Sequence, residues 1–137
     1  MTNECRISAA LLCRSVSPGL DGSNNINGTW EAVVLRPGVE QLPINIYVYV
    51  TASTPGDHFI KIGVIGLSRQ ESAPQRETKI TIVRGKFAAS AEITLLLDRP
   101  QKGTYWIDIL LDGKDVARLP FTIHLGEMVA PPSAFYF

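Results

Sequence analysis

The stretch that decides the fold is Gly103-Thr-Tyr-Trp-Ile-Asp-Ile-Leu-Leu-Asp-Gly-Lys-Asp-Val-Ala-Arg-Leu-Pro-Phe-Thr-Ile123. It contains two alternating apolar runs on either side of an Asp-Gly pair. Alternation with a period of two is typical of half-buried strands, and Asp-Gly favours the tight turn of a β-hairpin. The stretch therefore predicts a hairpin that closes an all-β domain.

The spacing of the apolar residues constrains the turn of this hairpin. A plain two-residue loop at Asp112-Gly113 would place Ile107 opposite Arg118. A three-residue connection or a bulge places Ile107 opposite Leu119 instead, so that two apolar side chains share one face. We predict the second register because it keeps both apolar sets on the same side of the hairpin.

Two residues of the hairpin carry further information. Tyr105 should pair with Phe121, and it follows the segment 100–103 in a way that resembles the tyrosine corner of immunoglobulin-like sandwiches. The alternative is a glycine turn followed by an ordinary strand-forming aromatic residue. Pro120 has no N–H to donate, so we expect its strand to lie at a sheet edge or to carry a bulge there.

Six further runs of strand-forming residues precede the hairpin, separated by glycine and proline. We predict strands over 5–14, 26–35, 44–50, 58–65, 78–83 and 87–97, in addition to 105–111 and 117–123. The strands 44–50 and 58–65 are spaced like a second hairpin. The pattern predicts a two-sheet antiparallel β-sandwich, immunoglobulin-like, with about eight strands. We expect one domain over 1–126 and a proline- and aromatic-rich tail over 127–137.

Charge and composition restrict the partners and the location. The formal net charge is zero, so no long-range field attracts phosphate backbones or anionic lipid, and we expect neither nucleic acid nor membrane as a partner. The first residues lack a secretory signal pattern, which favours a cytoplasmic protein. Cys5 and Cys13 would lie roughly 26 Å apart along one strand, too far for a disulfide. We expect both to be reduced core residues.

Three segments carry a family resemblance: Ala9-Ala-Leu-Leu-Cys13, Ile26-Asn-Gly-Thr-Trp30, and the closing hairpin from Gly103-x-Tyr105 to Pro120-Phe121. Together they resemble a group of small bacterial proteins that are classified only as a domain of unknown function. The resemblance spans most of the chain. It implies a single-domain sandwich and supplies no activity and no site residues.

Residues that carry chemistry do not gather along the sequence. His58 and His124 fall on separate predicted strands, and neither has a cysteine, a histidine or a carboxylate at ligand spacing. Cys13 and Ser68 lack the neighbouring base that a nucleophile requires. We therefore predict that the protein is not an enzyme and that it holds no metal and no cofactor.

Two groups of aromatic residues are candidate contact sites. Trp30, Tyr47 and Tyr49 would form a platform for a carbohydrate or another small molecule, and packing in the core is their alternative role. Phe135, Tyr136 and Phe137 end the chain after a Pro-Pro spacer. They would anchor a protein partner or a second copy of the chain, unless the tail folds back onto its own sheet or is disordered.

The sequence thus leads to two function hypotheses. The first is a non-enzymatic sandwich that acts through protein-protein contacts, as a structural unit or an adaptor, and uses a sheet edge or the aromatic tail. The second is a binding module for carbohydrate or another small molecule.

Overall fold

The structure is a computed structural model that describes residues 5–66, 75–126 and 134–136, and these ranges contain ten β-strands. The strands are β1 (Cys5–Pro18), β2 (Asn24–Thr29), β3 (Ala32–Leu35), β4 (Gln41–Ala52), β5 (Gly56–Ile65), β6 (Arg76–Ile82), β7 (Ala88–Asp98), β8 (Gly103–Leu111), β9 (Lys114–Leu125) and β10 (Ala134–Tyr136). No helix occurs in the described ranges, so none of their segments is a helix that spans a membrane.

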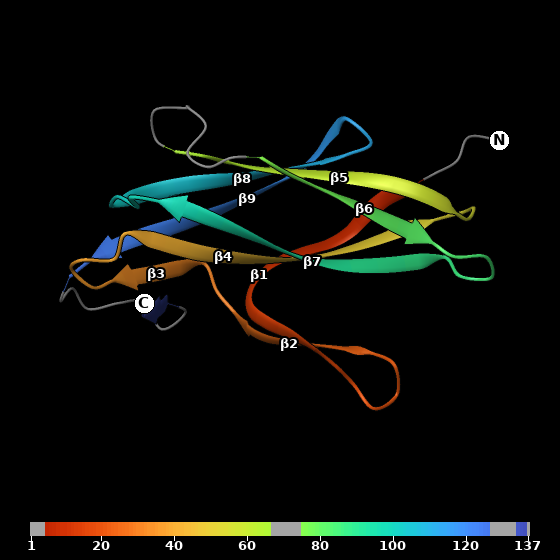
Figure 1. Cartoon of the computed structure of the whole chain (residues 1–137), viewed down its shortest axis with the longest axis horizontal. Coiled ribbons are helices and arrows are strands. Elements are labelled where there is room, and N and C mark those ends of the chain that lie inside the picture. Colours follow the sequence, from red (N-terminus) through yellow and green to blue (C-terminus); the bar gives the residue numbers. More distant parts are fainter. Residues whose placement is uncertain (1–4, 67–74, 127–133, 137) are drawn as a thin grey trace.

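The strands form two sheets, as Figure 1 shows. One sheet has the order β2-β1-β4-β7, and the other has the order β10-β3-β9-β8-β5-β6. The strand trios β1-β4-β7 and β9-β8-β5 match the A-B-E and G-F-C orders of immunoglobulin sandwiches. The predicted β-sandwich is confirmed.

The pairing within the second sheet differs from the prediction in one respect. β3 pairs with β9 in parallel, and β10 pairs with β3 in parallel, whereas we expected only antiparallel pairs. Parallel neighbours require a connection that crosses the molecule, and an alternating apolar pattern contains no information about strand direction.

The core lies between the two sheets and is built from alternating residues of each strand. On β4, Leu42, Ile44, Ile46, Val48 and Val50 are fully buried. Inward-facing residues of β5, β7, β8 and β9 meet them in one continuous cluster. Full burial of each such side chain contributes about 1.5–3 kcal/mol, which makes this cluster the main source of stability.

The closing hairpin has the predicted register. Ile107 pairs with Leu119, and Tyr105 pairs with Phe121. The loop consists of Asp112-Gly113, whose positive φ angles of 52° and 81° fit the type I′ turn. A register shift between Ile109 and Leu110 in the pairing with β9 then restores the apolar alignment. The hairpin therefore combines the tight turn with the predicted bulge.

The tyrosine corner is also present. The backbone N–H of Gln101 donates a hydrogen bond to the phenol oxygen of Tyr105 at 3.0 Å. Tyr105 is 7% exposed, and its ring stacks on Phe121 with the ring centroids 5.3 Å apart. The phenol thus fixes the loop before β8 to the core, as in immunoglobulin-like domains.

Two of the predicted elements are arranged differently. The hairpin predicted between 44–50 and 58–65 is wrong, because β4 and β5 belong to different sheets. The predicted strand 26–35 is two strands, since β2 and β3 also lie in different sheets. In both cases the chain passes from one sheet to the other at the break. The alternation of apolar residues is the same in either sheet, so it does not reveal the change of sheet.

The tail contributes one described strand. The backbone of Ala134–Tyr136 pairs with β3 and forms an edge of the second sheet, so this segment belongs to the sandwich of its own chain. Phe137 and residues 127–133 lie outside the described residues.

Candidate binding groove

A two-residue link joins one edge of each sheet. The backbone N–H of Trp30 donates to the carbonyl oxygen of Leu12 on β1 at 3.2 Å. The next residue, Glu31, accepts a hydrogen bond from the N–H of Thr122 on β9 at 3.0 Å. The chain therefore passes at this point from the edge of the first sheet to the edge of the second.

Beyond this link the edges of β1 and β9 have no neighbouring strand among the residues that the structure describes. β2 pairs with β1 only from Cys13 to Pro18, and β3 pairs with β9 only from Thr122 to Leu125. Residues 5–12 of β1 and 114–121 of β9 are paired on their other sides, with β4 and β8. The sandwich is open between these two edges.

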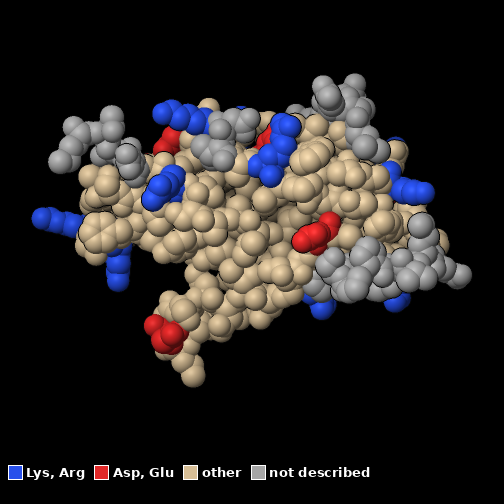
Figure 2. Space-filling view, turned by 180° about the vertical axis from the view of Figure 1, so that it is seen from behind, with Lys and Arg blue, Asp and Glu red and all other residues tan. Residues whose placement is uncertain are grey.

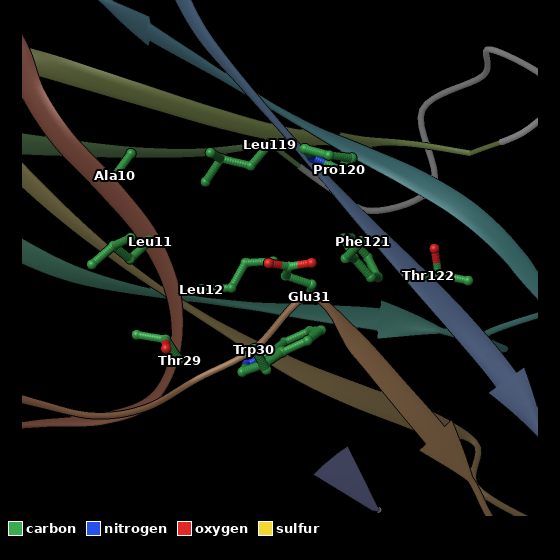
Figure 3. A pocket seen from close by; sticks show the side chains of 10 residues that line it. All are labelled: Ala10, Leu11, Leu12, Thr29, Trp30, Glu31, Leu119, Pro120, Phe121 and Thr122. Atoms are coloured by element: carbon green, nitrogen blue, oxygen red, sulfur yellow. The ribbon is translucent and has the colours of Figure 1, made fainter. Parts of the chain in front are cut away.

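A groove of about 590 Å³ occupies this opening (Figure 3). The groove is mostly apolar, and it is lined by Ala10, Leu11, Leu12, Thr29, Trp30, Glu31, Leu119, Pro120, Phe121 and Thr122. Leu12, Trp30 and Phe121 are buried in its wall, whereas Leu11 is 38% exposed. The Trp30 ring packs edge-on against Phe121 with the ring centroids 5.6 Å apart, which gives the groove a rigid aromatic wall.

One of the residues that line the groove, Glu31, carries a charge. Figure 3 shows the Glu31 carboxylate between β1 and β9, and the other lining side chains are apolar or hydroxyl-bearing. Glu31 is exposed, so its carboxylate is solvated and offers a cationic group of a ligand a charge-assisted hydrogen bond.

Pro120 lies on the open part of β9. The N–H of Thr122 points to the β3 side, so the nitrogen of Pro120, two residues earlier, points to the same side. No described strand lies there to require a donor. The strand is therefore an open edge at Pro120, as predicted, whereas β3 covers its last four residues, and the bulge lies away from Pro120.

The three aromatic residues of the predicted platform do not share an exposed surface. Trp30 is 4% exposed and lies in the groove wall, and Tyr47 is 7% exposed. Tyr47 lies on a central strand, between Leu11 of β1 and Glu92 of β7. Tyr49 is 37% exposed. Trp30 belongs to the core cluster, which corresponds to the core-packing alternative, whereas Tyr47 is buried on the face of β4 opposite to Ile46 and Val48 and lies outside that cluster.

Figure 2 shows one face of the molecule, on which Lys, Arg, Asp and Glu are scattered over a mostly uncharged surface. Among the described residues, several charged side chains form hydrogen bonds with a neighbouring side chain. Arg118 donates to Asp108 at 2.6 Å and lies 6.0 Å from the centre of the Trp106 ring, and Gln41 donates to Asp98 at 2.9 Å. These carboxylates are bound to separate neighbours and do not converge on one site.

A second group of reactive side chains lies apart from the groove. Cys5, His58 and Asp112 come from β1, β5 and the β8–β9 turn, and their ligand atoms all lie within 4.8 Å of one another. His58 Nδ1 is 2.7 Å from Asp112 Oδ2. The sequence places no metal ligand at motif spacing around His58, yet the fold brings Cys5 and Asp112 to it from distant parts of the chain. Sequence spacing gave no signal, because the three residues are far apart in the chain.

The environment of this group shifts two of its pKa values. Burial raises the pKa of the Cys5 thiol, and the negative charge of Asp112 raises it further. Burial also raises the pKa of Asp112, but hydrogen bonds from His58 and Phe59 and the charges of His58 and Lys114 outweigh this effect. The net result is a lowered pKa for Asp112 and a thiol that stays protonated at neutral pH.

Solved structures with a similar fold are domains of much larger proteins. A putative beta-galactosidase from Bacteroides fragilis has a TM-score of 0.59 at 12% identity, and the match covers 92% of this chain and 18% of that one. A family 2 glycosyl hydrolase from Bacteroides cellulosilyticus has a TM-score of 0.55 at 10% identity, with 88% and 15% covered. A beta-glucosidase from Listeria innocua, in complex with glucose, has a TM-score of 0.51 at 11% identity, with 93% and 16% covered.

At these identities the likeness concerns the fold alone, and this chain spans less than a fifth of each of those proteins. No curated protein sequence matches the chain significantly. A sequence family described as "Family of unknown function (DUF6941)" matches residues 8–124, which is most of the chain and includes every residue that lines the groove. The protein belongs to this family of unknown function.

Proposed function

We propose that this domain is a non-enzymatic binding module that acts through protein-protein contacts and receives an extended peptide segment in the groove between β1 and β9. The observation that supports the proposal is an apolar groove flanked by two strand edges without a described neighbouring strand. Addition of a peptide strand to such an edge supplies main-chain hydrogen bonds, and alternate side chains of the peptide enter the groove.

The edge of β1 is the better of the two for pairing. The carbonyl oxygen of Leu12 points to the open side, where it accepts from Trp30. The N–H and C=O of Ala10, two residues earlier, point the same way and are available to a ligand strand. On β9, Pro120 has no N–H to offer. The peptide would therefore pair with β1 and place its apolar side chains against Leu12, Trp30 and Phe121.

Glu31 would select the sequence of the peptide. Its carboxylate lies in the groove, so a lysine or arginine of the peptide would form a charge-assisted hydrogen bond with it. The preferred ligand is an extended segment in which apolar residues alternate with others, one of which is basic.

Selection from a random peptide library displayed on phage tests this proposal. Selected peptides should contain the alternating pattern, and a synthetic copy should shift the amide NMR signals of residues 10–12 and of Leu119, Phe121 and Thr122. Leu11→Lys should weaken binding at least tenfold. Leu96→Lys is the matched control, because Leu96 is 50% exposed and does not line the groove. Failure to select any peptide, shifts elsewhere in the protein, or equal effects of the two variants would contradict the proposal.

Carbohydrate binding is the second candidate. Trp30 lines the groove, and an indole is a suitable surface for a sugar ring, but it is 4% exposed and Tyr47 does not reach the surface beside it. A thermal-shift screen with oligosaccharides separates the two functions, since a specific ligand well above its dissociation constant raises the unfolding temperature. Stabilisation by a sugar that is lost in Trp30→Phe would favour the second candidate.

A further inference from the structure

Cys5, His58 and Asp112 bring three kinds of metal-binding donor together from both sheets. Cys5 is the first residue of β1 in the first sheet, and His58 and Asp112 belong to the second sheet and its β8–β9 turn. A thiol, an imidazole and a carboxylate lie within 4.8 Å of one another. They share no residue with the groove.

The positions of these side chains are set by the backbone. The N–H of Asp112 donates to the carbonyl oxygen of Phe59 at 2.8 Å, and the N–H of Phe59 donates to Asp112 Oδ1 at 2.9 Å. The other carboxylate oxygen binds His58, whose side chain is only 14% exposed. Cys5 pairs with Ala52 on β4 and packs against the core. Such supporting contacts orient ligands before a metal arrives.

The donor set selects the class of metal ion. Calcium and magnesium take oxygen ligands, whereas zinc and similar borderline-soft ions take cysteine, histidine and carboxylate ligands together. Around tetrahedral zinc, ligand atoms at about 2.0–2.3 Å from the metal lie roughly 3.3–3.8 Å from one another. The longest of these separations, up to 4.8 Å, would shorten by about 1 Å, whereas His58 Nδ1 and Asp112 Oδ2, which are 2.7 Å apart, would move apart as the ion replaces the proton between them.

We propose that Cys5, His58 and Asp112 form a binding site for a zinc-type divalent transition-metal ion. Three protein ligands bind the ion, and a fourth position remains for water or another ligand. Because the ligands come from both sheets, the bound ion links the two sheets at this end of the sandwich.

A cysteine nucleophile is the competing role for the same residues. A nucleophilic thiol needs a lowered pKa, and burial together with the charge of Asp112 raises the pKa of Cys5. A divalent cation reverses this balance, because coordination favours the thiolate over the thiol. The convergence of the three donors decides between the two roles, because a metal site uses the thiol, the imidazole and the carboxylate together, whereas a thiol nucleophile needs only a base beside it.

Titration of the chelator-treated chain of residues 1–137 with Co²⁺ tests the site. We expect one equivalent to bind with a near-ultraviolet thiolate-to-cobalt charge-transfer band, and one equivalent of Zn²⁺ to remove this band. Cys5→Ala should abolish the band, and His58→Ala should weaken binding at least tenfold. Cys13→Ala and His124→Ala are matched controls, since these residues lie outside the group, and both should keep the band.

A second measurement uses the unaltered chain, so it does not depend on the folding of variants. One equivalent of Zn²⁺ should slow alkylation of Cys5 by iodoacetamide at least tenfold, as followed by peptide mass spectrometry, and should leave Cys13 unchanged. Absence of a thiolate band, a band that persists in Cys5→Ala, or alkylation of Cys5 that Zn²⁺ does not slow would overturn the proposal.

Discussion

At the scale of single residues, Tyr105 connects the loop before β8 to the core through one hydrogen bond. Tyr105→Phe removes the acceptor of the Gln101 N–H and keeps the ring that stacks on Phe121. We expect the free energy of unfolding to fall by about 1 kcal/mol, the usual net value of one hydrogen bond. Urea denaturation measures the difference, provided that the dependence of the unfolding free energy on urea concentration is the same in both proteins.

Tyr49→Phe is the control for this prediction. Tyr49 is 37% exposed on the outer side of β4, so loss of its hydroxyl should change stability by no more than about 0.5 kcal/mol. Equal losses in the two variants would mean that the hydrogen bond of Tyr105 adds nothing to stability.

We expect the protein to lose stability at alkaline pH because of the buried thiol of Cys13. Burial raises the pKa of its thiol, the charge of Glu92 raises it further, and a hydrogen bond from the Tyr47 backbone opposes both. In the unfolded chain the thiol ionises near its ordinary pKa of about 8.5. Between the unfolded and the raised folded pKa, the unfolded state binds fewer protons, so stability falls as pH rises.

The contribution of Cys13 is isolated by a variant. Above about pH 8.5, Cys13→Ala should show a shallower decline of the unfolding free energy than the unaltered protein. Other groups titrate in this range in both proteins and cancel in the difference. Parallel curves for the two proteins would show that the thiol of Cys13 ionises equally in the folded and unfolded states.

At the scale of elements, the closing hairpin depends on the left-handed conformation of its turn. Gly113 has a φ of 81°, and an added Cβ meets no neighbouring atom, so only backbone strain opposes a side chain. Gly113→Ala should therefore lower the unfolding free energy by about 1–2 kcal/mol. The unfolding midpoint in urea measures this loss.

Gly63→Ala is the matched control for the turn. Gly63 lies in β5, its φ is outside the left-handed region, and an added Cβ would meet only the Gln75 side chain at 3.4 Å. An alanine at that position restricts the unfolded chain, so stability should stay nearly the same or rise slightly. A loss at Gly63 as large as that at Gly113 would rule out backbone strain as the cause.

The sequence pattern predicted the elements whose contacts join residues that are close together in the chain. The Asp112-Gly113 turn and the apolar face from Tyr105 to Leu111 fixed the register of the hairpin, since a slip by one residue would expose its apolar side chains. The tyrosine corner was recognisable for the same reason: its hydrogen bond joins residues four positions apart.

Features that depend on distant contacts were not predictable from the pattern. Trp30 and Glu31 carry the chain from one sheet to the other, yet the run from 26 to 35 looks like one strand. The groove follows from that crossing, and so it was missed. The group of Cys5, His58 and Asp112 likewise comes from three separate strands or turns, and no sequence spacing indicates it.

At the scale of the whole molecule, the tail decides whether β3 presents a free edge. β10 pairs with β3 in the same chain, and β3 pairs with β9 on its other side. Removal of residues 131–137 would expose the backbone edge of β3 from Ala32 to Val34, where β10 pairs with it. An unprotected strand edge is a template for association with another chain.

We therefore expect the full chain to be monomeric, and a chain that ends at Ala130 to associate as its concentration rises. Light-scattering mass across a dilution series of both chains measures this difference. The sequence predicts instead that Phe135, Tyr136 and Phe137 anchor a second copy of the chain. In that case the result is the opposite: the chain with its tail forms a defined oligomer, and the shortened chain is a monomer. The direction of the mass change on truncation thus separates a tail that protects its own sheet from a tail that joins two molecules.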